Sequence, residues 1–367
     1  MNKQSILFII NPISGTKGKA NLGALIHDRL NLSAFDYDIV YTQYAGHASE
    51  LSINAVSQKK NIIVAVGGDG TINEVARTLV HTDAVLGIIP FGSGNGLARH
   101  LHIPMNPEQA IDIINKYVVR KLDYGLIDGQ PFFCTCGVGF DAFVSFKFAS
   151  SERRGLLSYL ENTLKEGLKY KPETYIIENE DGTQHFDAFL IACANASQYG
   201  NNAYIAPKAS MEDGLFDVII MEPFNAIEAP QIAIQLFNKT LDHNSHIKMF
   251  RSKKIKIYRE HSGEAHCDGE PILTGKEINI ELKKQGINML INPDFFETSP
   301  KENIFQIFVE RFRDISRLHN EFIKKSESFN KSIIKTIKRG TRTVAPVSTV
   351  AGLVVLVAVS PFKPGSV

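Results

Sequence analysis

Four short apolar runs in the first 115 residues, separated by amphipathic stretches, constrain the fold of this chain most strongly. The runs are rich in Ile, Leu, Val or Phe, as buried parallel strands are, and cover residues 5–10, 37–42, 61–66 and 85–90. Helical patterns separate them, at residues 21–30, 47–58 and 71–80. This alternation predicts a parallel sheet with helices on both faces, in which ligands bind beyond the carboxyl ends of the strands.

The most informative loop is GGDGTINEV, residues 67–75, directly after the third predicted strand and at the start of a helix. Its three glycines let the backbone approach a bulky anionic ligand. Thr71 can cap the helix, whose free N–H groups attract phosphate. The Asp69 carboxylate would then lie among negative phosphate groups. This arrangement costs free energy unless the carboxylate binds Mg²⁺ or takes a proton. A glycine-rich turn with a solvated aspartate is the simpler alternative.

Two further loops follow predicted strands in the same way. Residues 11–15 (NPISG) combine small side chains with several free N–H donors, and residues 90–96 (PFGSGNG) again lead into a helix. Thr42 ends the second strand on the same edge. Three such loops at one sheet edge favour a phosphate-binding site. Neither G-x-x-x-x-G-K-[ST] nor an early G-x-G-x-x-G is present, so neither a P-loop nor a dinucleotide fingerprint is predicted.

The sequence changes character from about residue 118. Asp128-Gly129 and Asp181-Gly182 lie between apolar or alternating runs, which is typical of hairpins. Further strands are predicted at residues 131–137, 173–178, 186–194, 215–221, 253–258, 277–282 and 288–291. Helical patterns interrupt them near residues 156–168 and 227–237. We expect a mostly antiparallel second domain, a sandwich rather than a barrel.

The C-terminal part is basic and amphipathic. Residues 301–367 carry twelve Lys or Arg and five Asp or Glu, and residues 301–342 form one long helical pattern with an aromatic side. Such a helix suits an anionic membrane surface, although packing on the preceding domains or on a partner chain is an alternative. The apolar run 344–359 contains Pro346 and is shorter than the ~20 residues of a usual span. A span, an interfacial anchor and a disordered tail all stay open.

Composition excludes some classes of function. The net charge of +1 indicates no general affinity for nucleic acid. The cysteines match no zinc spacing and indicate no disulfide framework: Cys134, Cys136, Cys193 and Cys267. The N-terminus has no signal-peptide pattern, so we expect the folded part to be cytoplasmic. A homodimer stays open. The expected organisation is a nucleotide-binding domain over residues 1–125, a β-sandwich over 126–298 whose last strands can return to the first domain, and an appendage over 299–367.

In combination, these motifs resemble the diacylglycerol kinase catalytic-domain family, which includes sphingosine kinases and bacterial lipid kinases. The resemblance spans roughly residues 4–297. It depends on four motifs in order: the Asn-Pro-x-Ser-Gly loop, the GGDGTxNEV loop, the P-x-G-[ST]-G-N loop and a late Asp-Gly-Glu at residues 268–270. It implies a phosphofructokinase-like α/β domain followed by a β-sandwich, with the active site between them and Mg²⁺ and ATP as cofactors.

The resemblance also implies roles for individual residues. The nucleotide site would comprise Asn11, Ser14, Gly15, Thr42, Gly67, Gly68, Asp69, Gly70, Thr71, Asn73, Glu74, Ser93, Gly94 and Asn95. Glu270 would be the general base, with Asp268 nearby and Asp69 at the phosphates. A carboxylate suits this role, because a lipid alcohol is a poor acid whose proton must be removed as the bond to phosphorus forms.

Residues 211–217 resemble a segment that holds a structural Mg²⁺ in bacterial members of the family. Asp213 would supply a carboxylate and Leu215 a backbone carbonyl, both hard ligands, and the third position falls on Ser210, where some members have an acid. Arg153-Arg154 matches a basic pair that reaches the phosphates in sphingosine kinases, although an exposed helix start is an equal alternative. Gly96 stands where many bacterial members have Asp, which favours a sphingoid substrate slightly.

The sequence therefore predicts an ATP-dependent kinase for a hydroxyl of diacylglycerol or a sphingoid base, peripheral or tail-anchored at the inner face of the membrane. One alternative is an NAD kinase-like enzyme, which shares the Gly-Gly-Asp-Gly loop. Another is a non-catalytic nucleotide-binding subunit tethered to the membrane. The kinase prediction requires Glu270 to face the loop around Asp69.

Overall fold

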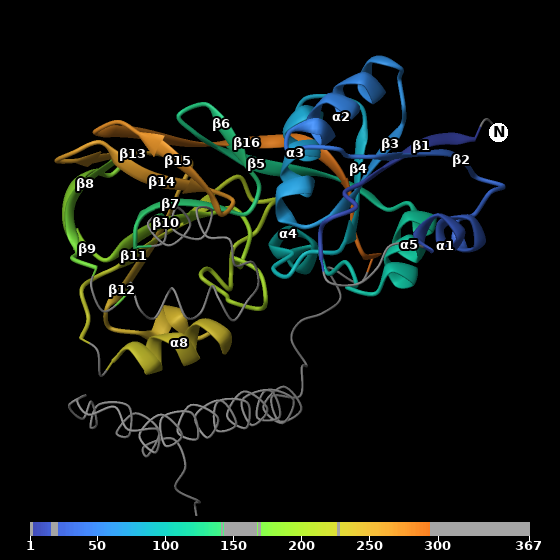
Figure 1. Cartoon of the computed structure of the whole chain (residues 1–367). Helices are drawn as coiled ribbons and strands as arrows, with labels where there is room; N and C mark the ends of the chain where they lie inside the picture. Colours follow the sequence, from blue (N-terminus) through green and yellow to red (C-terminus); the bar gives the residue numbers. More distant parts are fainter. Residues whose placement is uncertain are drawn as a thin grey trace, which may run out of the picture. The chain divides into compact units, whose positions relative to one another are not determined.

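A computed structural model describes residues 3–15, 21–140, 142, 167, 170–225 and 228–293 (Figure 1). Residues 1–298 form one compact unit. Apart from residue 167, the predicted helix near 156–168 lies outside the described residues, as do Arg153-Arg154 and the whole appendage after residue 298. Within the described ranges, no helix is both long and apolar enough to cross a membrane.

The N-terminal half contains the predicted parallel sheet. Its strands run in the order β2-β1-β3-β4 and are β1 (Gln4–Ile10), β2 (Phe35–Tyr41), β3 (Ile62–Gly67) and β4 (Val85–Pro90). The helices that accompany it are α1 (Leu22–Arg29), α2 (His47–Ser57), α3 (Asp69–Leu79), α4 (Gly96–His100) and α5 (Pro107–Lys116). Every residue of β3 and β4 is buried, which explains why these strands read as continuous apolar runs.

The C-terminal half contains an antiparallel sheet in the order β12-β11-β10-β7-β14-β15. Its strands are β7 (Thr135–Gly139), β10 (Leu190–Ala194), β11 (Phe216–Met221), β12 (Ile247–Ser252), β14 (Gly263–Cys267) and β15 (Glu270–Thr274). Helix α8 (Ala229–Phe237) and a 3₁₀ turn, η1 (Leu241–His243), precede β12.

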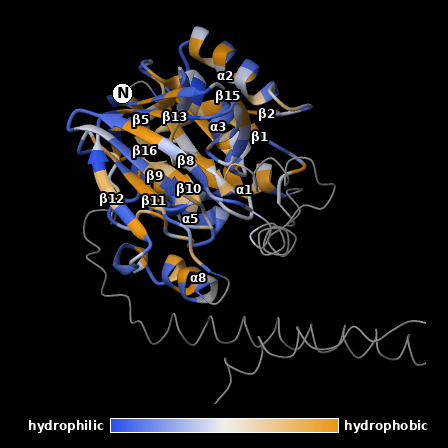
Figure 2. Ribbon diagram, turned by 90° about the vertical axis from the view of Figure 1, so that its left-hand side faces the viewer, coloured by the Kyte–Doolittle hydropathy of each residue, from blue (hydrophilic) through white to orange (hydrophobic). Residues whose placement is uncertain are grey.

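A second layer covers this sheet. It consists of β5 (Val119–Ile127), β6 (Gln130–Phe132), β8 (Glu173–Asn179), β9 (Gly182–Ala188), β13 (Lys254–Arg259) and β16 (Glu277–Leu290). One apolar core joins the layers, with Ile177 and Ile257 from one sheet and Val138 and Val218 from the other. Figure 2 shows the apolar residues along these strands. The predicted fold class, a parallel α/β sheet followed by an antiparallel sandwich, is confirmed.

Strand β16 connects the two halves. It pairs in antiparallel fashion with β13 and β5, and through Asn288 and Met289 it pairs in parallel with β4. The strands predicted separately at 277–282 and 288–291 are therefore one strand, with an irregularity between Lys283 and Ile287. The result is one ten-stranded sheet that runs from the α/β half into the sandwich.

Candidate active site

The three glycine-rich loops meet backbone to backbone at the carboxyl ends of β1, β3 and β4. A Cβ atom added to Gly92 would lie 2.7 Å from the Cα of Gly68. A Cβ on Gly15, whose φ is +75°, would lie 2.1 Å from the carbonyl oxygen of Phe91. Only glycine permits these approaches, so the glycines fix the loops against each other.

We expect Gly92→Ala to weaken nucleotide binding, because the new methyl group meets backbone that cannot move aside. Overpacking of this kind costs about 1–3 kcal/mol. A cost of about 1.4 kcal/mol would lower the affinity for the nucleotide about tenfold. Titration with a fluorescent ATP analogue measures the effect. Gly23→Ala in α1 is the control, since its Cβ would meet only Ile39 Cδ1 at 3.7 Å. Equal affinity in both variants would contradict the prediction.

The start of α3 faces these loops without a side-chain cap. Its N-cap is Gly68, which makes no side-chain bond, so the prediction that Thr71 caps the helix is wrong. The helix begins two residues before Thr71, whose hydroxyl instead accepts a hydrogen bond from Asn11 Nδ2 at 3.0 Å. Backbone N–H groups of the first helical turn lack intrahelical partners, and an anion can satisfy them.

Asn73 adds a donor in the first turns of α3. Its side chain is 3% exposed, and its Nδ2 has no hydrogen-bond partner among the residues that the structure describes. A buried donor without a partner is costly, and a bound ligand would remove that cost. The amide and the uncapped helix start fit an anionic nucleotide.

Asp69, the first residue of α3, holds the third loop in place. Its Oδ2 accepts a hydrogen bond from the backbone N–H of Asn95 at 2.8 Å, and its Oδ1 accepts one from Gly96 at 2.7 Å. Burial raises the pKa of Asp69, although these bonds and the charge of Arg99 counteract the rise. Asp69 therefore joins the GGDG loop to the 90–96 loop, a role that its sequence position did not indicate.

A hairpin from the sandwich brings Glu270 to the same place. Asp268 and Gly269 form the two-residue turn between β14 and β15, with φ values of 52° and 78°, as a type I′ turn requires. Glu270 is the first residue after the turn. A Cβ added to Gly70 would lie 3.8 Å from Glu270 Oε1, so this carboxylate borders the glycine loop.

Asp268 supports the hairpin rather than reaching outward. Its carboxylate accepts hydrogen bonds from three successive backbone N–H groups, those of Phe133 (2.8 Å), Cys134 (2.7 Å) and Thr135 (3.0 Å). Burial raises the pKa of Asp268 to about 6, against the effect of these three bonds. The side chain ties the turn that precedes Glu270 to the start of β7.

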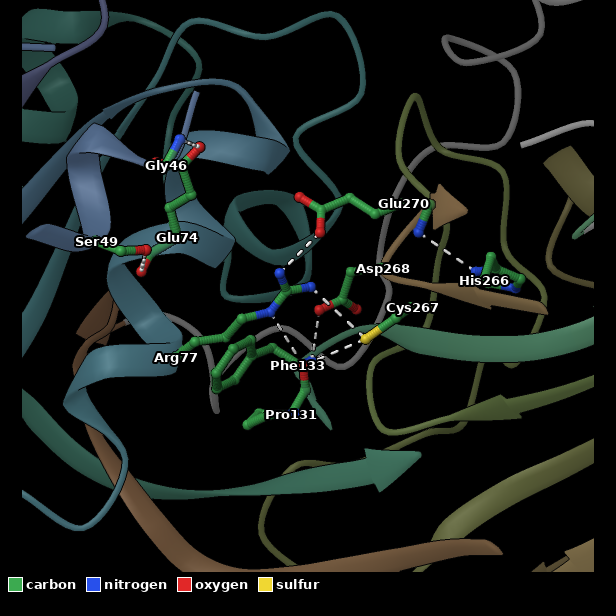
Figure 3. Close-up of polar contacts among 11 residues, drawn as sticks. Gly46, Ser49, Glu74, Arg77, Pro131, Phe133, His266, Cys267, Asp268 and Glu270 are labelled. Carbon is green, nitrogen blue, oxygen red and sulfur yellow. Dashed lines mark hydrogen bonds and ion pairs between the residues drawn. The ribbon is translucent and has the colours of Figure 1, made fainter. Parts of the chain in front are cut away.

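Arg77 is a site residue that the sequence reasoning missed. Its Nη1 lies 2.7 Å from Glu270 Oε2, and its Nε donates to the carbonyl of Pro131 at 3.3 Å (Figure 3). Its Nη2 lies 3.6 Å from Cys267 Sγ. The signal in the sequence was its position in α3, two turns after Asp69 and thus near the same helix face.

Glu74 has a different set of contacts from those expected of a nucleotide ligand. Its carboxylate accepts hydrogen bonds from the backbone N–H groups of Gly46 and Ala48, both at 3.0 Å, and its carbonyl accepts one from Ser49 Oγ (Figure 3). Gly46 is the N-cap of α2, so Glu74 satisfies the free N–H groups of that helix. Its carboxylate is engaged there.

In the loop predicted to hold a structural Mg²⁺, two of the three predicted donors have partners within the protein. Asp213 forms an ion pair with Arg251, which neutralises the carboxylate, and Ser210 Oγ accepts the N–H of Glu212 at 3.3 Å. The buried Asp123 fixes the loop instead, since its carboxylate accepts the N–H groups of Gly214 (2.8 Å) and Gln285 (2.7 Å).

We therefore expect a chelator to leave the thermal midpoint of the nucleotide-free protein unchanged. Asp123→Asn should instead lower the free energy of unfolding by about 1–3 kcal/mol, because its NH₂ group would face one of the two backbone donors. Thermal and urea unfolding measure both effects. Asp112→Asn, which loses an ion pair with the exposed Arg29, is the control. A midpoint that falls with the chelator would restore the metal prediction.

Two models of known protein domains match this chain. Residues 5–127 match the model of the diacylglycerol kinase catalytic domain, and residues 134–282 match that of the YegS C-terminal NAD kinase beta sandwich-like domain. Together with the fold, these matches define a kinase with a catalytic α/β domain followed by a β-sandwich. The α/β half of the chain therefore belongs to the diacylglycerol kinase catalytic-domain family.

Individual relatives agree with this assignment. A diacylglycerol kinase of Bacillus subtilis (strain 168) is 27% identical over 279 residues, which cover 74% of this chain and 92% of the relative. A diacylglycerol kinase of Mycobacterium tuberculosis (strain CDC 1551 / Oshkosh) is 26% identical over 306 residues, covering 80% and 90%. The solved structure of a putative diacylglycerol kinase from Bacillus anthracis str. Sterne has a TM-score of 0.64 at 24% identity, covers 80% of this chain and 99% of its own, and shares the fold.

Proposed function

We propose that this protein is an ATP-dependent lipid kinase that phosphorylates a hydroxyl of diacylglycerol or a sphingoid base. The observation that carries the proposal is the position of Glu270, a carboxylate from the sandwich that borders the glycine loop at the start of α3. A nucleotide-binding loop and a carboxylate base on opposite sides of one site are what transfer to an alcohol needs.

The α/β half would bind the triphosphate. The uncapped start of α3, the Asn73 amide and the three packed loops supply donors for phosphate oxygens. Mg²⁺ that accompanies ATP would neutralise charge on the phosphates as the bond to the leaving oxygen breaks. Asp69 would hold the ion, because each of its oxygens gives one lone pair to a backbone N–H and keeps another.

Glu270 would act on the acceptor. As the acceptor oxygen forms its bond to the γ-phosphorus, its proton passes to Glu270 Oε1, and the bond from that phosphorus to the bridging oxygen of ADP breaks. A carboxylate held at this point argues against the alternative of a non-catalytic subunit. Against the NAD kinase-like alternative stand the Asn-Pro-x-Ser-Gly loop and the late Asp-Gly-Glu motif. Asp268 would contribute by fixing the turn that precedes Glu270.

One observation favours diacylglycerol over a sphingoid base. The relatives described above are named diacylglycerol kinases.

The basic appendage would bring the enzyme to its substrate. Residues 301–367 have twelve basic and five acidic side chains, and each basic side chain near an anionic leaflet contributes about 1 kcal/mol of attraction. We propose peripheral binding or tail anchoring at the inner face of the membrane on this ground.

The test is phosphate transfer from radioactive ATP, with Mg²⁺, by the purified full chain. Acceptors are vesicles containing diacylglycerol, vesicles containing sphingosine, and NAD in solution, with product masses determined by mass spectrometry. We expect labelled phosphatidic acid. Labelled NADP would establish the NAD kinase alternative. ATP binding without labelling of any component of a total lipid extract would establish the non-catalytic one.

A further inference from the structure

We propose that Arg77 is a positioning residue that holds Glu270 with one carboxylate oxygen facing the glycine loop. The inference rests on the proposed function, because it assigns a role to Glu270 in catalysis. Arg77 belongs to α3 in the α/β half, whereas Glu270 belongs to β15 in the sandwich, so their contact joins the two sides of the site (Figure 3).

The two oxygens of Glu270 have different surroundings. Arg77 Nη1 lies 2.7 Å from Oε2, a distance typical of a charge-assisted hydrogen bond. Oε1 is the oxygen directed towards Gly70, 3.8 Å from where a Cβ on that residue would lie. Arg77 therefore engages the oxygen remote from the glycine loop and leaves the near one for an acceptor proton.

Arg77 is itself held by two further elements. Its Nε donates to the carbonyl of Pro131 in β6, and its Nη2 contacts the thiol of Cys267 in β14. Its side chain is 21% exposed, against 38% for Glu270, so Arg77 is the more buried partner. A guanidinium has a fixed planar set of donors, so these two contacts orient the group and with it the donor that faces Glu270.

Electrostatics agree with the geometry. Burial lowers the pKa of Arg77, whereas its interactions with Glu270, Cys267 and Asp268 raise it. The second effect is larger, so the pKa of Arg77 is raised and the guanidinium stays charged. These three groups, all from the β14–β15 hairpin, are the titratable neighbours that act on it. A permanent cation at Oε2 gives the carboxylate one preferred orientation.

A double-mutant cycle tests the inference with the full-length enzyme. Single-turnover phosphoryl transfer is measured for the wild type, Arg77→Met, Glu270→Gln and the double variant. We expect Arg77→Met to lower the rate about tenfold to 100-fold, the usual range for a charge-assisted contact, with an unchanged KM for ATP. In the Glu270→Gln background the same substitution should change the rate less than about twofold, because Arg77 acts through Glu270.

Two further variants keep the test decisive. Arg77→Lys retains the charge without the fork and should recover part of the rate; if Arg77→Met does not fold, the same cycle is run with Arg77→Lys. Arg29→Met, which removes the exposed ion pair to Asp112, should leave the rate unchanged. If the fold-reductions in rate of the two single variants multiply in the double variant, Arg77 does not act through Glu270. That result would overturn the positioning role and leave the kinase proposal standing. A wild type that labels no lipid would refute the proposed function, and the inference with it.

Discussion

Replacing Glu270 by Gln is expected to lower turnover at least about 100-fold while the KM for ATP stays close to the wild-type value. The amide has nearly the shape of the carboxylate but cannot take the proton from the lipid hydroxyl. It also loses the ionic contact with Arg77, which lies 2.7 Å from Oε2. Both the lost base and the lost ionic contact lie where the lipid hydroxyl binds, so we expect the affinity for ATP to be unchanged. Initial rates with radioactive ATP and diacylglycerol vesicles measure the effect.

Glu260→Gln is the matched control. This glutamate follows β13, and its side chain is 86% exposed. It should retain wild-type turnover. A rate for Glu270→Gln within a few-fold of the wild type would remove Glu270 from the role of base.

Asp69→Asn is expected to lower turnover by at least about 100-fold and, unlike the Glu270 variant, to raise the KM for ATP as well. The carboxylate accepts two hydrogen bonds, from the backbone N–H groups of Asn95 and Gly96. The amide of the variant can accept only one, and its NH₂ group would face the other donor. The 90–96 loop would move away from the GGDG loop, and the charge proposed to hold Mg²⁺ would be lost.

Asp83→Asn, an exposed aspartate in the turn after α3, controls for the change of residue type. Steady-state rates over a range of ATP concentrations separate the two parameters. An unchanged KM with lower turnover would show that Asp69 acts on charge alone. An unchanged turnover would contradict both of its proposed roles.

The sequence predicted the α/β half well because its signals are local. Buried parallel strands are continuous apolar runs, and β1, β3 and β4 begin within one residue of the predicted runs. The Asp-Gly pair at residues 128–129 likewise predicted the β5–β6 hairpin, since both residues adopt positive φ values.

Pattern alone was less informative in the sandwich. The run 186–194 was predicted as one strand but is divided between β9 and β10, which belong to different sheets. Similarly, the run 131–137 is divided between β6 and β7. A segment that passes from one layer to the other stays apolar throughout, because both of its strands contribute to the shared core. The hydrophobic pattern therefore does not show where the first strand ends and the second begins.

The site could be predicted in outline but not in its pairings. Spacing and resemblance indicated the loops and Glu270, and the structure brings them together. The partners of Arg77, Glu74 and Asp123 could not be inferred, because each lies on an element far away in sequence. The contact between Arg77 and Glu270, for instance, joins residues 193 positions apart. Only the tertiary fold determines which oxygen meets which donor.

Strand β16 limits how the enzyme can move during turnover. Many kinases close by rotating one lobe against the other about a few flexible linker residues. Here a single 14-residue strand is hydrogen-bonded to β4 at one end and to β13 at the other. A wide rotation would break that ladder, so we expect substrate entry and product release to depend on local displacement of the short turns around the site.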